Sequence, residues 1–425
     1  MTPYIVTFII STLALWLSEK ARETTLRLPL RTIAVLSVAS LAGMREWTVG
    51  GPDALKYGDP IFQSSLGSAS ISQAISNAQE VGAKGELGYV LVNYAVSRFT
   101  DSFPFLLFVL AIITNTIILC AILIARRFGS PILMWITYLF TTYATTFNLL
   151  RQSVALALTV LGVSLLLARR RKLSFVIGLS GVAFHTSAML FLVVYFIALM
   201  ADHYSTKTGK HALRVIVAAL MVTGIAFYCA IRLSSQYLSD EYGSYLESDQ
   251  NQQGSLGVNV LYRTIPIIVG LIAARVARKA ATDSTSVDEN PIVLQNDTPS
   301  TTPTLIKFAK PNDPPLADHD NRTEQKTSRT LETSRYCATV VLLALLAVDL
   351  VYVSLRTLNA TLGRIVMYFS WAKVIAYSVF LEPLEFPRAL NTVMITAFCY
   401  AYFYWIFIAN GVAVYTFGDG FWLRF

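Results

Sequence analysis

Charged residues are scarce in this chain. Only 14% of its 425 residues are Asp, Glu, Lys or Arg, whereas 54% are hydrophobic, and the mean hydropathy is +0.54. Soluble domains carry about 25% charged residues, so this composition excludes an ordinary water-soluble protein. The apolar stretches are continuous, whereas the strands of an outer-membrane barrel would alternate apolar and polar residues. The sequence therefore predicts an all-α polytopic membrane protein.

Motifs of several common enzyme classes are also absent. The chain has no P-loop, GxSxG, HExxH or CxxC pattern, and the polar loops 45–102 and 233–258 hold no DxD pair. ATP-driven transport, serine hydrolysis, zinc catalysis and a metal-dependent nucleotide-sugar site are thus without support. We expect no cofactor and no metal. The four cysteines lie in apolar stretches without close spacing, which predicts small buried residues and no disulfide: Cys120, Cys229, Cys337 and Cys399.

Long apolar segments are present throughout the chain. A membrane-spanning helix needs about 20 apolar residues, and the pattern predicts roughly twelve crossings. The first segment begins directly after Met1 without a basic region, so we interpret it as a span and not as a cleaved signal. The segments are 3–17, 28–44, 103–125, 131–148, 152–168, 173–184, 186–201, 212–232, 259–277, 336–355, 363–381 and 391–411.

The surplus of basic residues, a net charge of +8, sets the orientation. Cytoplasmic loops of membrane proteins collect Lys and Arg, so topology explains this charge better than nucleic-acid binding does. Four basic clusters fall on one side only if 173–201 is a helical hairpin bent at His185, with both chain termini outside. The half 173–184 is short for a full crossing, and a re-entrant or broken helix is the alternative. The clusters are Lys20 to Arg31, Arg126–Arg127, Arg169–Lys172 and Arg275–Lys279.

Polar stretches divide the chain into three predicted parts. Residues 1–279 form a transmembrane domain of nine spans with outer loops 45–102 and 233–258. Residues 280–334 are rich in Thr, Ser, Pro, Asp and Asn, which predicts a disordered cytoplasmic linker. Either a plain tether or a docking segment for a regulatory partner fits that linker. Residues 335–425 form the last three spans. Much of 68–100 could form an amphipathic helix on the membrane surface.

Several ionisable residues fall at the outer ends of the predicted spans, where they are costly and often functional. Arg45 precedes a Gly-Gly-Pro turn, and Arg151 lies between two spans that share almost no loop. Guanidinium groups grip phosphate in a bidentate manner, so outward arginines favour an anion site. The alternatives are an interfacial Arg45 whose head reaches water, an interhelical ion pair for Arg151, and a structural, hydrogen-bonded His185. Further outward arginines are Arg263, Arg356 and Arg364.

Five short motifs in this order resemble the EpsG family, the Wzy-like polymerases of bacterial polysaccharides. Their order and rough spacing match over nearly the whole chain, with one extra residue before Asp53 and with 280–334 as an insertion. The matching residues are Arg45, Val49, Gly50, Asp53 and Tyr57; Glu86, Gly88, Tyr89 and Asn93; Asn148, Arg151 and Gln152; Phe184, His185, Ser187 and Ala188; and Arg364 with Tyr368.

This resemblance implies a multi-pass protein of the bacterial cytoplasmic (inner) membrane with a GT-C-like fold. Such proteins transfer a growing glycan from undecaprenyl pyrophosphate to the next lipid-linked repeat unit on the outer leaflet, without nucleotide sugar or metal. Their partners would be the lipid-linked oligosaccharide, the bilayer and possible chain-length regulator and flippase proteins. The general base would be Asp53, Glu86 or His185, which the sequence does not rank. The pyrophosphate or substrate would contact Arg45, Tyr57, Tyr89, Asn148, Arg151, Gln152, Arg364 and Tyr368.

Two other functions remain open from the sequence. A transporter or flippase of lipid-linked oligosaccharides would also need outward cations and a polar cavity. A membrane O-acyltransferase or ligase often relies on a His paired with Asp or Asn, for which His185 alone gives little support.

Overall fold

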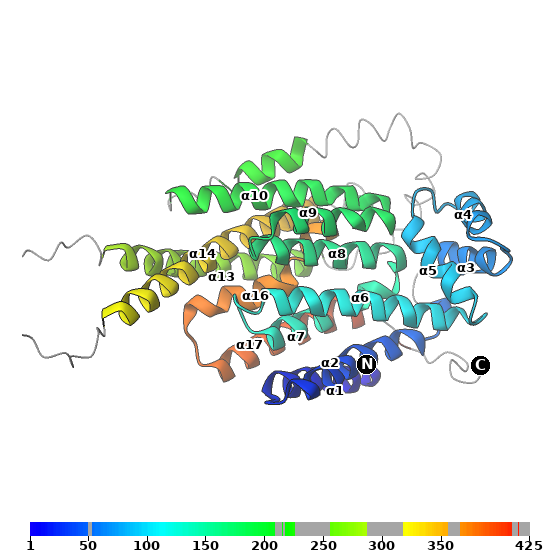
Figure 1. Ribbon diagram of the computed structural model, residues 1–425, viewed down its shortest axis with the longest axis horizontal. Coiled ribbons are helices and arrows are strands. Elements are labelled where there is room, and N and C mark those ends of the chain that lie inside the picture. The colour runs from blue at the N-terminus through cyan, green and yellow to red at the C-terminus, as the bar shows by residue number, and fades with distance from the viewer. Residues whose placement is uncertain are drawn as a thin grey trace, which may run out of the picture.

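The protein is a bundle of helices that run roughly along one axis in the computed structural model (Figure 1). The structure describes residues 1–49, 53–208, 215, 217–225, 256–286, 318–355, 366–409 and 415. Every regular element in these ranges is a helix. The all-α prediction is therefore confirmed for the described part of the chain.

Eight helices of the described residues are long and apolar enough to cross a membrane. The polytopic class is thus confirmed, whereas the expected count of about twelve is not. The expected span 131–148 is divided into α7 (Pro131–Thr141) and a 3-10 turn (Tyr143–Phe147). Parts of the expected spans 212–232 and 363–381 lie outside the described residues. The eight spans are Thr2–Lys20, Thr24–Gly43, Phe103–Ala125, Leu150–Leu167, Thr186–His203, Gly257–Ala281, Glu332–Val351 and Arg388–Ile408.

Helix α8 (Leu150–Leu167) lies at the centre of the bundle and is almost wholly buried. It packs against α6 (Phe103–Ala125) and α9 (Arg171–Leu179). In a bilayer no hydrophobic force draws helices together, so their association depends on close packing. Small residues in α8, among them Ser153, Ala157 and Gly162, allow neighbouring backbones to approach closely. Arg151 falls in the first turn of this central helix, so packing of α8 fixes where that side chain begins.

The chain reverses at His185, as the hairpin prediction required. Helix α9 leads through a 3-10 turn (Ser180–Ala183) to His185, and a second turn (Thr186–Leu190) leads into α10 (Phe191–Thr208). Figure 1 shows α9 and α10 side by side. A Cβ at Gly178 would lie 2.1 Å from the ring of Phe191, so the hairpin closes only with glycine there.

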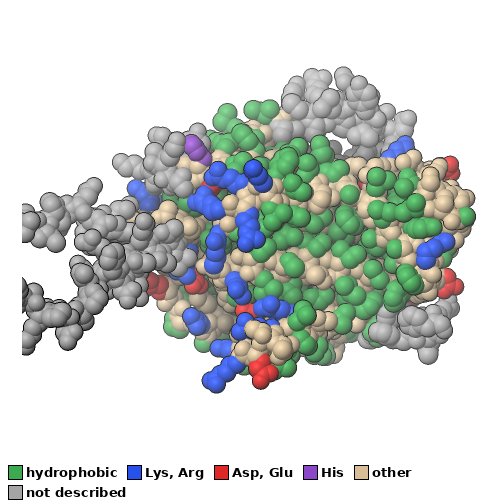
Figure 2. All heavy atoms as spheres, in the orientation of Figure 1, with side chains coloured by type: hydrophobic (Ala, Val, Ile, Leu, Met, Phe, Trp, Pro, Cys, Tyr) green, Lys and Arg blue, Asp and Glu red, His purple; other side chains and the backbone are tan. Residues whose placement is uncertain are grey.

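Basic side chains gather in a band at one end of the molecule (Figure 2). At this end α1 (Thr2–Lys20) leads into α2 (Thr24–Gly43), and α8 leads into α9 (Figure 1). Helices α3 (Asp59–Leu66), α4 (Ile71–Glu80) and α5 (Leu87–Ser97) lie at the opposite end. By the positive-inside rule we expect the band to face the cytoplasm, and we call the opposite end, with α3–α5, the outer end.

The single surface helix expected over 68–100 is instead two helices, α4 and α5. Gly82 and Gly85, with φ of 98° and 77°, form the turn between them in a conformation that favours glycine. Helix α5 does not lie on the surface alone, because Tyr89, Val90 and Asn93 are buried. Tyr89 and Val90 join a core cluster with residues of α3, α6 and α8. This difference matters because the turn carries Glu86.

Helices extend into the predicted linker from both sides. Helix α13 (Leu256–Ser286) continues beyond residue 279, and α14 begins at Asp318 and ends at Leu355. Residues 287–317 lie outside the described residues, and the three-part division stays a prediction. The last helices of the bundle are α16 (Lys373–Leu381) and α17 (Arg388–Phe403).

The cysteine prediction is correct in part. Cys337 and Cys399 are buried, and they and Cys120 are free thiols. Cys120, on α6, is exposed, against expectation. Cys229 lies outside the described residues.

Candidate functional site

An ion pair between Arg151 and Glu86 lies at the outer end of α8. Arg151 Nη1 is 2.5 Å from Glu86 Oε2, and the two side chains are 11% and 5% exposed. Arg151 comes from the first turn of α8, whereas Glu86 precedes the first residue of α5. The pair thus joins the outer helices to the central helix, and the interhelical ion pair considered for Arg151 is present.

Two further groups surround the guanidinium of Arg151. The ring of Tyr57 lies 4.4 Å from its central carbon, a cation–π distance. The carbonyl of Gly82 is 3.5 Å from Nη1. Tyr57 belongs to a short π-helical turn (Ala54–Gly58) that precedes α3. Aromatic, carbonyl and carboxylate groups therefore hold Arg151 from different directions.

His185, at the hairpin bend, lies beside this pair. Its Nδ1 is 3.6 Å from Glu86 Oε1. The same Nδ1 accepts a hydrogen bond of 3.3 Å from the backbone N–H of Ser187 and is 3.2 Å from the Ser187 hydroxyl. Since a backbone N–H donates, Nδ1 acts as the acceptor when the ring is neutral, and the proton then sits on Nε2. The hairpin thus places a partly exposed imidazole within reach of a buried carboxylate.

Ser187 connects the hairpin to the C-terminal part of the chain. Its hydroxyl is 2.9 Å from the hydroxyl of Tyr368, which also interacts with the side chain of Gln152. Tyr368 is 1% exposed and Gln152 is 2% exposed. Residues 152, 185, 187 and 368 therefore share one polar network despite their separation in sequence.

Asp53 and Asn148 lie on the remaining side of the site. The backbone N–H of Asp53 donates to Asn148 Oδ1 over 3.5 Å. The Asp53 carboxylate acts electrostatically on both Glu86 and Arg151. Tyr89 is wholly buried on α5, and the positive charge of Arg151 acts on its hydroxyl group.

The buried Glu86 carboxyl has an altered acidity. Burial raises its pKa, and the neighbouring Arg151 guanidinium opposes this rise without cancelling it. The backbone N–H of Thr186 also stabilises the carboxylate, while the negative charge of Asp53 disfavours it. A buried carboxyl whose pKa lies above the ordinary value for Glu is a candidate group for accepting and returning a proton.

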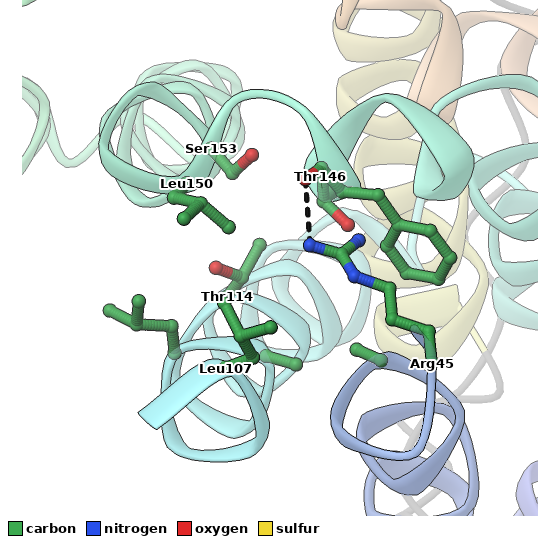
Figure 3. A pocket seen from close by; sticks show the side chains of 10 residues that line it. Arg45, Leu107, Thr114, Thr146, Leu150 and Ser153 are labelled. Atoms are coloured by element: carbon green, nitrogen blue, oxygen red, sulfur yellow. Dashed lines mark hydrogen bonds between the residues drawn. The ribbon is translucent and has the colours of Figure 1, made fainter. Parts of the chain in front are cut away.

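Arg45 lies apart from this cluster, in a pocket between α2, α6 and the start of α8 (Figure 3). Its Nη2 donates to the carbonyl of Phe147 over 2.7 Å, and the Phe147 ring lies 4.1 Å from its central carbon. Among the described residues Nε and Nη1 have no hydrogen-bond partner, although both are buried. The pocket is small and partly open to the outside. Its walls are Ala42, Leu107, Leu110, Ala111, Thr114, Thr146, Phe147, Leu150 and Ser153.

The charge of Arg45 has no carboxylate to balance it among the groups of the described part that affect it. Burial lowers its pKa to about 10, and the side chains acting on it are Tyr143, Tyr4 and Tyr415. It therefore stays cationic at neutral pH. Arg45 is only 3% exposed, so the alternative of an interfacial arginine whose head reaches water is wrong.

The structure brings together most of the residues that the sequence singled out. Glu86, His185, Arg151, Tyr57 and Asp53 form one cluster, which Gln152 and Tyr368 join through Ser187. Arg45 sits in its own pocket, and Arg364 and Arg356 lie outside the described residues. Arg263 pairs instead with Asp349, at 2.9 Å, which neutralises it.

Two contacts were missed by sequence reasoning. No sequence pattern indicated that Ser187 bridges His185 and Tyr368, although Ser187 follows His185 by two residues. The stacking of Tyr57 on Arg151 joins two residues whose spacing fits no helical or strand period. Within the described residues no group of three or more His, Cys, Asp and Glu side chains could hold a metal ion.

Comparison with known proteins gives one match. The model of the EpsG family matches residues 29–290, which include this cluster apart from Tyr368, and more than half of the chain. No curated protein and no solved structure matches.

Proposed function

Because this chain belongs to the EpsG family, we propose that it polymerises polysaccharide repeat units at the outer face of a bacterial cytoplasmic membrane. The family supports an exopolysaccharide-type polymerase, and the eight apolar helices support a membrane location. The basic band at the other end of the molecule supports an outer position for the Glu86–Arg151 cluster. The substrates we propose are oligosaccharides linked to undecaprenyl pyrophosphate.

The proposed reaction is a glycosyl transfer between two lipid-linked units. The acceptor hydroxyl oxygen attacks the anomeric carbon that is bonded to the donor pyrophosphate. A glycosidic C–O bond forms, the C–O bond to pyrophosphate breaks, and its electron pair leaves with the lipid pyrophosphate. The hydroxyl proton passes to a protein base. Such a step needs positive charge at the leaving group and a base nearby, which this cluster combines.

The observation that carries the proposal is the position of Arg151. It is a charged side chain at the outer end of the central helix, beside a carboxylate and an imidazole. We assign Arg151 to the pyrophosphate and keep Glu86, His185 and Asp53 as the candidate bases. The contact between Glu86 and His185 favours these two as a pair. Tyr57, Tyr89, Asn148, Gln152 and Tyr368 would line the substrate site, and Arg45 and Arg364 would add positive charge. A GT-C-like fold and the absence of a metal requirement belong to the same proposal.

Polymer length in cells tests this function. Arg151→Ala at normal membrane level should abolish long polymer and leave single repeat units on the outer side. Arg127→Ala is a matched control, because Arg127 also donates to a backbone carbonyl, that of Leu167 at 2.8 Å, but lies at the basic end. Unchanged long polymer in Arg151→Ala would refute the proposal. Units trapped inside the cell would instead indicate a flippase.

A further inference from the structure

The Arg151 site is already filled by an anion of the protein itself. Glu86 Oε2 lies 2.5 Å from Arg151 Nη1, and Tyr57 lies 4.4 Å from the guanidinium carbon. This short charge-assisted bond at Nη1 is thus taken by Glu86, and a phosphate oxygen gains it only by displacing that carboxylate. Arg151 is therefore engaged by a carboxylate of the protein itself.

The local charge also opposes an incoming phosphate. Arg151 supplies one positive charge, whereas Glu86 and Asp53, which both act on it, supply two negative charges. Both carboxylates therefore repel a phosphate that approaches Arg151. Like charges at a binding site lower affinity strongly, so a pyrophosphate gains little from Arg151 unless Glu86 leaves.

A second polar group, the His185 imidazole, lies close to the Glu86 carboxylate. His185 Nδ1 is 3.6 Å from the other carboxylate oxygen, beyond hydrogen-bond distance. Glu86 itself follows the turn that contains Gly82 and Gly85, both at positive φ, and precedes the first residue of α5. The imidazole therefore offers Glu86 a second partner close by once Nδ1 carries a proton, which ends the hydrogen bond that Nδ1 accepts from Ser187.

From these contacts we propose that Glu86 is an internal counter-ion that masks Arg151 until a lipid pyrophosphate displaces it. The inference rests on the proposed function and adds a regulatory step to it. Displacement engages the phosphate with Arg151 and releases Glu86 toward His185, where the carboxylate stabilises an imidazolium. Acid–base groups thus become available only when the donor is bound, which protects the site from unproductive reaction with water.

Equilibrium binding to the purified full-length protein tests the exchange without any need for catalysis. The probe is radiolabelled geranylgeranyl pyrophosphate, with geranylgeraniol as the uncharged lipid and inorganic pyrophosphate as the lipid-free anion. Glu86→Gln keeps the size of the side chain and removes the competing charge, so it should bind the lipid pyrophosphate about tenfold more tightly than the unmodified protein. Geranylgeraniol binding should not change.

A double-mutant cycle locates the effect. Arg151→Gln should weaken binding of the lipid pyrophosphate, and Glu86→Gln combined with Arg151→Gln should bind no better than Arg151→Gln alone, because the two groups act on each other. The matched control is Glu19→Gln, which removes the carboxylate of another ion pair, 2.7 Å from Arg31, and should leave affinity unchanged. Thermal unfolding of each variant verifies its fold, and Glu86→Asp, with a shorter reach to Arg151, should show a smaller gain in affinity.

Two binding results would contradict the proposal that a lipid pyrophosphate displaces Glu86 from Arg151. Equal or weaker binding by folded Glu86→Gln and Glu86→Asp, or a gain that persists without Arg151, contradicts it. The polymer assay separates this inference from the proposed function. If Arg151→Ala loses polymer but Glu86→Gln does not bind more tightly, only the exchange is contradicted. If Arg151→Ala makes normal polymer, the proposed function is contradicted even if the binding pattern holds.

Discussion

Glu86 Oε1 and His185 Nδ1 lie 3.6 Å apart, although they come from the turn before α5 and from the bend of the α9–α10 hairpin. The distance is too long for a hydrogen bond, and one forms only when Nδ1 carries a proton, because the carboxylate oxygen accepts. Glu86 meanwhile holds Arg151, and His185 accepts from the backbone of Ser187. The two acid–base candidates are thus poised next to each other while each is engaged elsewhere.

The pH dependence of polymerisation should reflect Glu86. Burial raises its pKa above the usual value for Glu, and the carboxyl therefore stays protonated to higher pH in the folded protein. If the carboxylate accepts a proton, kcat/KM should rise with pH through this raised pKa. Glu86→Gln should lower kcat/KM by about 10²-fold or more and remove this inflection. A Glu86→Gln enzyme with an unchanged pH profile would exclude the carboxylate as the titrating group.

The same pKa shift predicts the direction of a stability effect. The folded state holds the Glu86 proton more firmly than the unfolded chain, where the pKa is ordinary. The free energy of unfolding should therefore decrease as pH rises from the ordinary value through the raised one. Thermal unfolding across this window should show a smaller decrease for Glu86→Gln than for the unmodified protein.

Ser187 should matter for activity because it bridges His185 and Tyr368. Ser187→Ala removes the hydroxyl that lies 3.2 Å from Nδ1 and 2.9 Å from the Tyr368 hydroxyl. We expect kcat to fall about tenfold, the equivalent of one hydrogen bond, with little change in protein level. Ser180→Ala is the control, since the Ser180 hydroxyl bonds only locally, to the carbonyl of Ile177. Equal activity in the two variants would show that the bridge has no role.

Arg45 should be needed for activity more than for folding. It is a buried cation whose Nε and Nη1 have no hydrogen-bond partner in the described part of the chain, in a pocket with three hydroxyl-bearing residues. Arg45→Gln should lower polymer synthesis by about tenfold or more through lost attraction for phosphate, and Arg45→Lys should retain part of it. The measurement is polymer yield at matched membrane level, with Arg127→Gln as the control. Activity that survives Arg45→Gln would assign the pocket no part in the reaction.

The hairpin should depend on Gly178. A Cβ there would lie 2.1 Å from the ring of Phe191, so Gly178→Ala should lower the free energy of unfolding by about 1–3 kcal/mol. Gly257→Ala is the control, since a Cβ at Gly257 meets nothing within 4 Å and alanine favours the helix. Thermal unfolding in detergent measures both, and equal midpoints would contradict the packing described for α9 and α10.

The buried pair of Arg263 and Asp349 should behave as a structural pair. Asp349→Asn leaves the Arg263 charge without its partner in the bundle and should destabilise by about 3 kcal/mol. The double variant Arg263→Met with Asp349→Leu should be less destabilised than Asp349→Asn, because it leaves no uncompensated charge. Thermal unfolding of the three proteins distinguishes these cases, and a double variant less stable than Asp349→Asn would contradict this account.

The sequence predicted correctly those features of the fold that depend on local composition. Continuous apolar segments predicted the helical membrane class, and the basic clusters required the reversal at His185 that the structure contains. It failed where an apolar stretch does not form a single helix. The segment 131–148 looked like one span but breaks at Thr142, and 68–100 looked like one surface helix but turns at Gly82 and Gly85.

The candidate site shows the same division. The sequence singled out Glu86, Arg151 and His185 individually, through polar residues in costly positions and through the order of family motifs. It treated Arg45, Arg151 and Arg263 alike, as outward cations for one phosphate site. The fold separates them: Arg151 pairs with Glu86, Arg45 lies in a pocket on Phe147, and Arg263 is neutralised by Asp349.

The amino-acid sequence by itself determined that this chain crosses a membrane many times, which end is basic, and to which family it belongs. Those properties follow from hydropathy, charge and motif order, which are local or additive along the chain. Only the tertiary structure decided which charge meets which partner. An ion pair such as Arg151 with Glu86 depends on how α5 and α8 both pack against α6, and that packing results from contacts among residues far apart in sequence.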